Sequence, residues 1–247
     1  MKAAFKKIMN IVPRPLLIKG SYIIRPFLIW YMKGNRFVDP IDNRGYKSLL
    51  PYGYENQREN VLSPGTYSLE RHRLMWLYLK NETDFFSKKY KVLHIAPEQS
   101  FYKRFRNMSN LDYLTSDLES PLADVKADIC NLPFEDNSFE VIFCNHVLEH
   151  IPDDAKAMSE LFRVLKPGGW GILQVPISYQ REVTYEDPNK LYRIEVHLNN
   201  EEIKDYCKSH NTYQDIYMIN DSAMLADMFT YHLSAVIRFT KGRTKLN

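Results

Sequence analysis

Polar side chains that could bind a ligand or accept a proton follow directly after an apolar run near the middle of the chain. Val141, Ile142 and Phe143 lack the alternation of a half-exposed strand, which indicates a parallel strand covered on both faces. Asn145 and His146 come next, at the carboxyl end of that strand. Open α/β sheets bind ligands at this edge, so both residues are candidates for a binding site.

Glu149 adds a second side chain that can take part in proton transfer. It follows Asn145 by four residues, a spacing that places two side chains on the same face of a helix. Histidine and glutamate are common general bases, so His146 and Glu149 are the candidate catalytic residues. His150 is interpreted as a packing or capping residue.

Acidic residues end two further predicted strands upstream. Residues 111–115 predict a strand that ends at Asp117. Residues 125–127 predict another, followed by Asp128. Both acids therefore stand, like Asn145, at strand ends where an α/β sheet binds its ligand.

The elements that must position these residues alternate between strands and helices. Residues 91–96 predict a strand and residues 99–106 a short polar helix. Asp153 and Asp154 open a second helix, which Pro-Gly-Gly at 167–169 ends. The apolar positions of that helix and of the following strand are Met158, Leu161, Phe162, Leu165, Ile172, Leu173 and Val175. This alternation predicts an α/β fold with a mostly parallel sheet.

Two segments closely resemble a known family. Residues 131–140 (NLPFEDNSFE) are similar to the "LPF-DNSFD" stretch of class I S-adenosylmethionine (SAM)-dependent methyltransferases of the type 11-like group, and residues 161–169 to their "L-RVLKPGG" turn. The resemblance implies a Rossmann-like, mostly parallel seven-stranded sheet with helices on both faces. It also implies SAM as the cofactor, with a small-molecule or lipid-linked acceptor.

The resemblance further implies which residues hold SAM. Asp117 lies 23 residues after His94, close to the spacing of about 20 expected for the acid that binds the ribose hydroxyls. Asp128 stands where the family binds the adenine amino group, and the backbone amide of Ile129 where it meets a ring nitrogen. Arg71, on a helix expected to run from Ser68 to about Phe86, is the candidate for the carboxylate of SAM.

The first turn departs from the family pattern. Most members carry Gly-x-Gly there, whereas residues 94–98 read His-Ile-Ala-Pro-Glu and contain no glycine. A subset of methyltransferase-like proteins shares this form together with the Ser-Leu-Glu-Arg-His-Arg run at 68–73, and the resemblance to it covers residues 36–187. We therefore assign His94, Ala96, Glu98 and Asn145 to the cofactor site as well. A loop that binds nothing is the alternative.

Composition limits the remaining classes. The three cysteines, Cys130, Cys144 and Cys207, show neither metal spacing nor an even disulfide framework, which favours a cytoplasmic protein without a bound metal. Cys144 is interpreted as a packing residue. Residues 39–65 contain several turn signals and predict loops. The positions where related proteins suggest cysteine ligands for zinc hold Asp39, Asp42, Ser63 and Thr66.

The N-terminal segment is basic and apolar. Residues 1–38 carry eight Lys and Arg and no acid, so their charge is +8 within a chain whose net charge is +3. Aliphatic and aromatic residues interleaved with cations suit a helix that lies on an anionic membrane surface. A helix that packs on the protein's own core is the equal alternative. No nucleic-acid binding is expected, because the rest of the chain is acidic.

We therefore expect a basic amphipathic extension over 1–38, loops and a helix over 39–88, and a SAM-binding core over 89–247. The resemblance fades after residue 176, so it does not extend to the family's acceptor site, and the C-terminal third is divergent. The predicted function is SAM-dependent methyl transfer in the cytoplasm, with peripheral association at the inner face of the membrane. The alternative is a catalytically inactive Rossmann-like binding protein at the membrane surface. A nicotinamide oxidoreductase is disfavoured, because Gly-x-Gly-x-x-Gly is absent.

Overall fold

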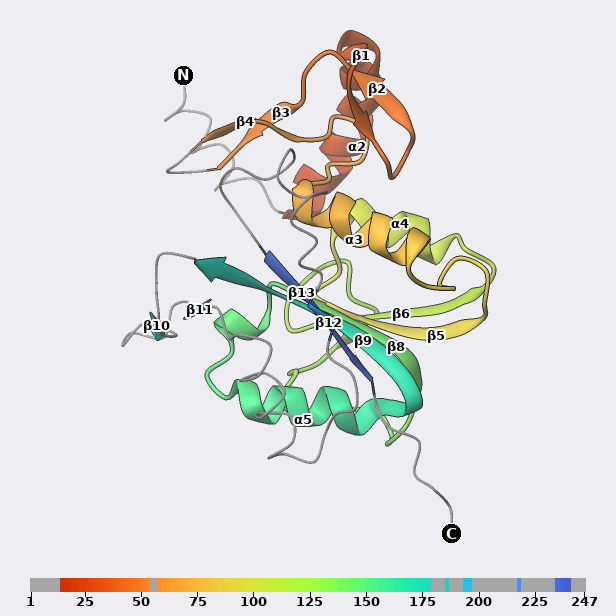
Figure 1. Cartoon of the computed structure of the whole chain (residues 1–247), viewed down its shortest axis with the longest axis vertical. Helices are drawn as coiled ribbons and strands as arrows, with labels where there is room; N and C mark the ends of the chain where they lie inside the picture. Colours follow the sequence, from red (N-terminus) through yellow and green to blue (C-terminus); the bar gives the residue numbers. More distant parts are fainter. Residues whose placement is uncertain are drawn as a thin grey trace. The chain divides into compact units, whose positions relative to one another are not determined.

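The computed structural model of the chain describes residues 14–53 and 57–178, together with the backbone of four short strands further on (Figure 1). Its side chains are described for residues 15–53 and 57–175. The chain divides into two compact units, Met1–Glu82 and Thr83–Asn247. The second unit contains the strand ends singled out in the sequence.

A parallel sheet forms the centre of the second unit. Its five parallel strands lie in the order β9-β8-β5-β6-β7. Their bounds are β5 (Tyr90–Ile95), β6 (Leu111–Asp117), β7 (Val125–Lys126), β8 (Phe139–Asn145) and β9 (Leu165–Ser178). The chain order changes direction between β5 and β8, which makes this edge a topological switch point. The predicted parallel α/β sheet is confirmed.

Short strands extend the sheet beside β9. β13 (Ser234–Thr240) pairs with β9 antiparallel and also with β12 (Tyr217–Met218). β11 (Arg193–Val196) pairs with β9 in parallel and with β10 (Tyr185–Glu186) antiparallel. Within the described residues the sheet thus has nine strands, where seven were expected, because short pairs form in the divergent C-terminal third.

Helices cover both faces of this sheet (Figure 1). On one face, α5 (Asp154–Val164) packs Ala157, Leu161 and Val164 into an aliphatic core. On the other, α4 (Gln99–Arg106) contributes Phe101 and Phe105, whose rings stack at 5.1 Å. The predicted helix over 99–106 is confirmed, and the four-residue spacing of its two phenylalanines is the reason for its single buried face.

The end of α5 differs from the prediction. Asp153 caps its start by accepting a hydrogen bond from Lys156 N, as the sequence suggested, but the helix ends at Val164 and β9 already begins at Leu165. The Pro-Gly-Gly turn therefore lies within the strand segment. Gly169 is required there, because a Cβ would approach Glu140 O to 2.8 Å.

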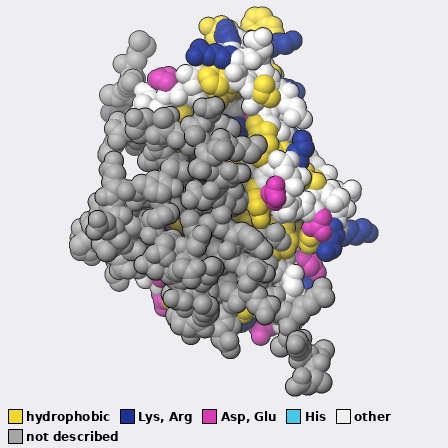
Figure 2. Space-filling model, in the orientation of Figure 1, with side chains coloured by type: hydrophobic (Ala, Val, Ile, Leu, Met, Phe, Trp, Pro, Cys, Tyr) yellow, Lys and Arg dark blue, Asp and Glu magenta, His cyan; other side chains and the backbone are white. Residues whose placement is uncertain are grey.

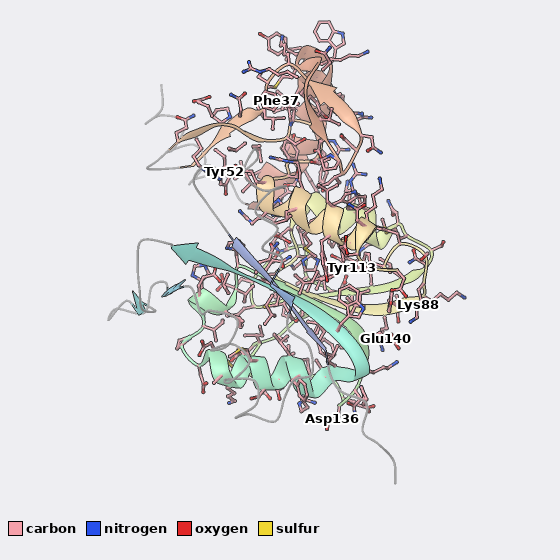
Figure 3. The ribbon with its side chains drawn as sticks, in the orientation of Figure 1. Phe37, Tyr52, Lys88, Tyr113, Asp136 and Glu140 are labelled. Atoms are coloured by element: carbon pink, nitrogen blue, oxygen red, sulfur yellow. The ribbon has the colours of Figure 1, made fainter. Side chains whose placement is uncertain are left out.

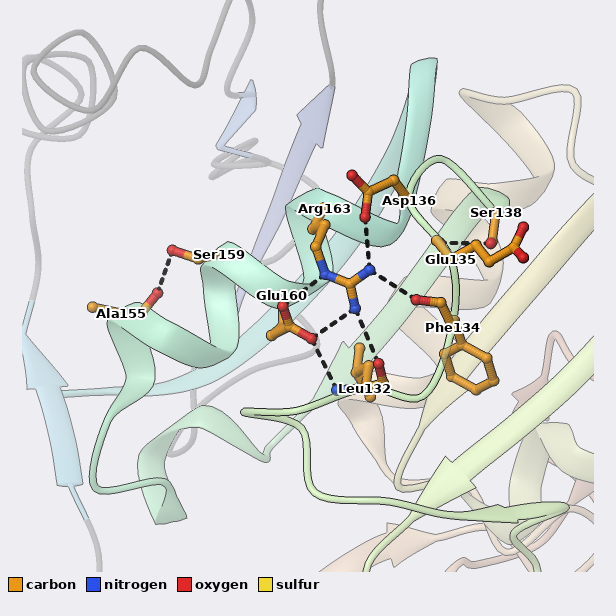
Figure 4. A network of polar contacts seen from close by, with 9 residues as sticks. All are labelled: Leu132, Phe134, Glu135, Asp136, Ser138, Ala155, Ser159, Glu160 and Arg163. Carbon is orange, nitrogen blue, oxygen red and sulfur yellow. Dashed lines mark hydrogen bonds and ion pairs between the residues drawn. The ribbon is translucent and has the colours of Figure 1, made fainter.

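Arg163 joins the two segments that carry the family resemblance (Figure 4). Its guanidinium donates to the carbonyl oxygens of Leu132 and Phe134 at 3.0 and 2.8 Å. It also pairs with Asp136 and with both carboxylate oxygens of Glu160. The planar fork of arginine suits several fixed acceptors at once, so Arg163 pins the loop after β7 to α5.

We expect Arg163→Lys to lower the free energy of unfolding by about 2 kcal/mol. A lysine can replace only one of the hydrogen bonds and leaves the carbonyl oxygens of the loop unpaired. Urea denaturation measures the loss, and Lys156→Ala, an exposed position on the same helix, is the control. Equal stability of Arg163→Lys and native protein would show that the network does not hold the loop.

Within residues 14–53 and 57–82, the first unit contains two helices and two hairpins. α2 (Arg14–Tyr31) is followed by the hairpin β1 (Lys33–Asp39)–β2 (Arg44–Tyr46), the hairpin β3 (Leu50–Tyr52)–β4 (Arg58–Leu62) and α3 (Glu70–Asn81). The prediction of loops over 39–65 was therefore incomplete, because the turn signals there connect short strands. The predicted helix is also shorter than expected. Its N-cap is Leu69, whose amide donates to the His72 ring, whereas the Ser68 hydroxyl donates to Asp39.

A buried polar cluster holds this unit together at the positions considered for zinc. Thr66 Oγ1 and Ser68 Oγ both donate to Asp39 Oδ2, at 2.5 and 3.2 Å. The Tyr46 hydroxyl donates to Asp42, and burial followed by the Asp39 charge raises the pKa of the Asp42 carboxyl. Hydrogen bonds thus connect residues that lie far apart in the sequence.

Candidate functional site

The strand register brings the predicted site residues into one row. Ile95 on β5 lies opposite Cys144 on β8 and Ser116 on β6. The next position along each strand is therefore Ala96, Asn145 and Asp117. Asn145 in turn pairs with Gln174 on β9. Three adjacent strands thus end in one row of residues at the carboxyl edge of the sheet, while β9 continues past Gln174 to Ser178.

The backbone turns sharply at two points of this row. Ala96 and His146, the residues directly after β5 and β8, have left-handed φ angles of 51° and 54°. Each still donates its amide to the neighbouring strand, Ala96 to Ser116 O and His146 to Gln174 O. Non-glycine residues in this conformation are strained and concentrate at functional sites. The turn without glycine therefore adopts a conformation that favours glycine.

Glu98 connects the tips of β5 and β8. Asn145 Nδ2 donates to Glu98 Oε2 at 2.9 Å, and His94 Nε2 lies 3.4 Å from the same oxygen. The Glu98 side chain is 14% exposed and Asn145 is buried. The Asn145 amide thus holds the carboxylate at the strand edge, with the His94 ring close by.

His94 lies beneath the row rather than at its surface. Its side chain is fully buried among Phe101, Phe105 and Phe143, and its Nδ1 lies 2.7 Å from the Tyr113 hydroxyl. Tyr113, labelled in Figure 3, comes from β6 and was not singled out in the sequence. His94 thus packs beneath the row, and its role in the cofactor site stays a prediction.

Asp117 presents a partly satisfied carboxylate at the end of β6. Its Oδ1 accepts hydrogen bonds from Glu119 N at 2.8 Å and Ser120 N at 2.7 Å. Its Oδ2 accepts none from the described part of the chain. The backbone amides hold the side chain in place, so the second oxygen can receive a hydroxyl group.

Asp124 anchors the strand that carries Asp117. Its Oδ2 accepts from Thr115 N and Thr115 Oγ1 on β6 and from Arg106 Nη2 at 2.6 Å. Burial alone would raise the pKa of the Asp124 carboxyl, but these hydrogen bonds outweigh it and lower the pKa below its usual value.

A lowered pKa in the folded state gives a stability term that is present above the unfolded pKa, about 3.9, and is lost as the pH falls through the folded value. We expect Asp124→Asn to cost about 1 kcal/mol at neutral pH, since partial exposure screens the ion pair. The difference between variant and native protein should shrink as the pH falls from neutral to well below about 3.9, the unfolded pKa. Urea unfolding at both pH values tests this, with Asp112→Asn, an exposed acid on β6, as the control.

Asp128 and Ile129 follow β7. Asp128 is exposed and its Oδ1 accepts from Cys130 N at 2.9 Å, while Ile129 is buried in the core. The short loop is thereby held in a fixed turn, with one carboxylate oxygen turned to its own backbone.

His146 and Glu149 form a pair after β8. Glu149 is 5% exposed and its Oε1 lies 3.1 Å from His146 Nδ1. The segment makes only one 3-10 turn, Leu148–His150, so the prediction that Glu149 shares a helical face with Asn145 was wrong. The left-handed turn at His146 directs the chain back and lets Glu149 contact the imidazole instead.

Cys144 takes no part in this chemistry. It is fully buried in the aliphatic core, and burial, followed by the charges of Glu149 and Glu98, raises the pKa of its thiol well above the usual range. Its interpretation as a packing residue is therefore supported.

Gln174 and Arg71 are the remaining polar residues to place. Gln174 is 1% exposed at the end of the row and was missed, although it is a polar residue inside the apolar run of β9. Arg71 is the second residue of α3 and belongs to the first unit.

A parallel sheet whose switch-point edge carries a fixed acid after β6 defines an α/β domain suited to a nucleoside-containing ligand. The comparisons agree. Residues 79–173 match the family described as "Methyltransferase domain". A solved structure, the [4+2]-cyclase SpnF, has a TM-score of 0.52 and 15% identity over 83% of this chain and 92% of its own. That likeness shows the fold alone.

Curated relatives match shorter segments. The demethylmenaquinone methyltransferase of Staphylococcus haemolyticus is 41% identical over 68 residues, 28% of each chain. The sterol 4-C-methyltransferase of Caenorhabditis elegans is 49% identical over 45 residues, which are 18% of this chain and 14% of that one. The matched segments thus span well under a third of either relative.

Residues 79–173 therefore carry a methyltransferase domain of the SAM-dependent class, in which SAM is the methyl donor. The resemblance drawn from residues 131–140 and 161–169 is confirmed, whereas membership of the His-Ile-Ala-Pro-Glu subset stays a prediction.

Proposed function

We propose that this protein transfers a methyl group from SAM to a lipophilic small-molecule or lipid-linked acceptor. The row of Asp117, Ala96, Asn145 and Gln174 across four adjacent strands, three of which end there, is the observation that carries the proposal. This row brings the Asp117 carboxylate, the tight turn at Ala96 and the buried side-chain amide of Asn145 to one edge of the sheet.

The residues present fit SAM. Asp117 offers one carboxylate oxygen for the ribose hydroxyls, and its other oxygen is held by backbone amides. Asp128 and the Ile129 amide would serve the adenine. Glu98, fixed by Asn145, supplies negative charge for the cationic methionine end. When bound, SAM supplies a methyl group on an already activated sulfonium.

The protein's main task is then to position the acceptor and exclude water. His146 is proposed as the general base for an acceptor that must lose a proton. An ionised carboxylate only accepts hydrogen bonds, so Glu149 keeps the proton on His146 Nδ1 and leaves Nε2 as the basic nitrogen. Glu149 is therefore a positioning residue for His146.

The acceptor class is proposed from the relatives. The demethylmenaquinone methyltransferase, the sterol 4-C-methyltransferase and the 2-phytyl-1,4-naphtoquinone methyltransferase of Nostoc punctiforme are named for lipophilic acceptors. We propose the same class here, in a cytoplasmic protein that associates peripherally with the inner face of the membrane through residues 1–38.

Incubation with methyl-labelled SAM tests the function. A membrane lipid extract and a soluble metabolite extract serve as acceptors, and we expect label to move into the organic phase only with the lipid extract. His146→Gln should slow the transfer without changing SAM affinity. Label in neither fraction, despite SAM binding, would favour the inactive binding protein.

A further inference from the structure

The helix α2 presents large apolar side chains to solvent on one face. They recur at spacings of three, four and seven residues, which places them in one row along the helix. This row, the outward stripe, consists of Leu16, Ile23, Ile24, Phe27, Trp30 and Tyr31. Ile23 is 79% exposed and Trp30 is 72% exposed. Burying such side chains away from water is favourable, so we expect a partner to cover the stripe.

The opposite face of α2 already packs within the first unit. The Tyr67 hydroxyl donates to Ser21 O at 2.5 Å. Directly after the helix, Met32 is buried with Tyr46 and Leu49. The core of this unit therefore forms without the outward stripe.

Aromatic rings and a cation gather at the C-terminal end of the stripe. The Phe27 ring lies 6.0 Å from Trp30 and 6.1 Å from Tyr31. Lys47 Nζ stands 4.2 Å from the centre of the Tyr31 ring. Tryptophan, tyrosine and lysine side chains together are typical of the boundary between lipid headgroups and acyl chains.

The charged residues of α2 and of the following segment up to Val38 are all basic. Lys19, Lys33 and Arg36 are exposed. The first two acids of the chain are turned inward, with Asp39 1% exposed and the Asp42 side chain 6% exposed. Figure 2 shows hydrophobic and basic side chains interleaved over the first unit, around α2. An anionic partner therefore complements this surface.

We infer that the outward stripe is a docking surface for an anionic lipid bilayer, with α2 lying in the plane of the interface. Within the described residues no helix is both long and apolar enough to cross a membrane. The inference rests on the membrane contact proposed above and assigns it to one face of one helix. It does not depend on methyl transfer, because the stripe would bind lipid whether or not SAM is present. The apolar side chains insert into the bilayer, and the cations are attracted to the anionic headgroups.

Flotation of the full chain with vesicles tests this surface without SAM. Vesicles contain either phosphatidylcholine alone or equal parts of phosphatidylcholine and phosphatidylglycerol. We expect binding to the anionic vesicles only, weakened by added salt. Ile23→Glu combined with Phe27→Glu should lower that binding by at least about tenfold. Leu118→Glu, which charges an exposed apolar side chain in the other unit, should leave it unchanged.

Trp30 gives a second readout from the native protein. Trp170 is buried and Trp76 is half-buried, so a blue shift of the emission on vesicle addition reports chiefly on Trp30. Trp30→Phe should keep vesicle binding but lose the shift. Undiminished binding of the double Glu variant would overturn the inference, as would equal binding to neutral vesicles. A lipid-free dimer that the double variant turns into monomer would assign the stripe to a second copy instead.

Discussion

Asp117→Asn is expected to weaken SAM binding by about 1.5–3 kcal/mol, which is roughly a tenfold to hundredfold loss of affinity. The substitution keeps an oxygen that can accept from Glu119 N and Ser120 N, so the turn after β6 should persist. It removes the negative charge and one acceptor site that the ribose hydroxyls would use. Isothermal titration with SAM measures the effect.

The matched control is Asp112→Asn, which removes an exposed charge from the same strand. It should bind SAM like native protein, because Asp112 lies at the other end of β6. Native affinity in a folded Asp117→Asn protein would remove Asp117 from the cofactor site.

Ala96→Val is expected to abolish measurable SAM binding. The residue turns the chain at the centre of the row with a φ of 51°, a conformation that β-branched side chains rarely adopt. The variant should also lose about 2 kcal/mol of stability from backbone strain. Ala96→Gly should stay within about 1 kcal/mol of native protein and keep SAM binding, because glycine accepts this φ without strain.

Asn137→Val is the control that separates the loss of stability from the loss of SAM binding expected for Ala96→Val. Asn137 has a similar φ of 55° but lies in the loop before β8, away from the row. It should lose stability while retaining the full thermal shift with SAM. A full SAM-induced shift in Ala96→Val would show that residues 94–98 are not the cofactor turn.

Much of the fold could be predicted because the relevant signals are local. β8 follows from the apolar run of Val141, Ile142 and Phe143, and α4 follows from the spacing of Phe101 and Phe105. The early end of α5 could not be predicted, because Leu165 continues the apolar pattern of the helix. In the structure Leu165 instead pairs with Phe139 on the neighbouring strand.

The site was predicted by position rather than by geometry. Asp117 and Asn145 stand at strand ends that any parallel register brings to one edge. The role of His94 depended on Tyr113 and Glu98, which contact it from other parts of the chain. Likewise the pairing of His146 with Glu149 required the left-handed turn, for which histidine gives no clear sequence signal.

Calorimetric titration of the full chain with SAM and with its demethylated product tests the central claim most directly. We predict saturable binding of both ligands at one site, with the affinity reduced in Asp117→Asn and retained in Asp112→Asn. No binding of either ligand by the folded native protein would contradict the account.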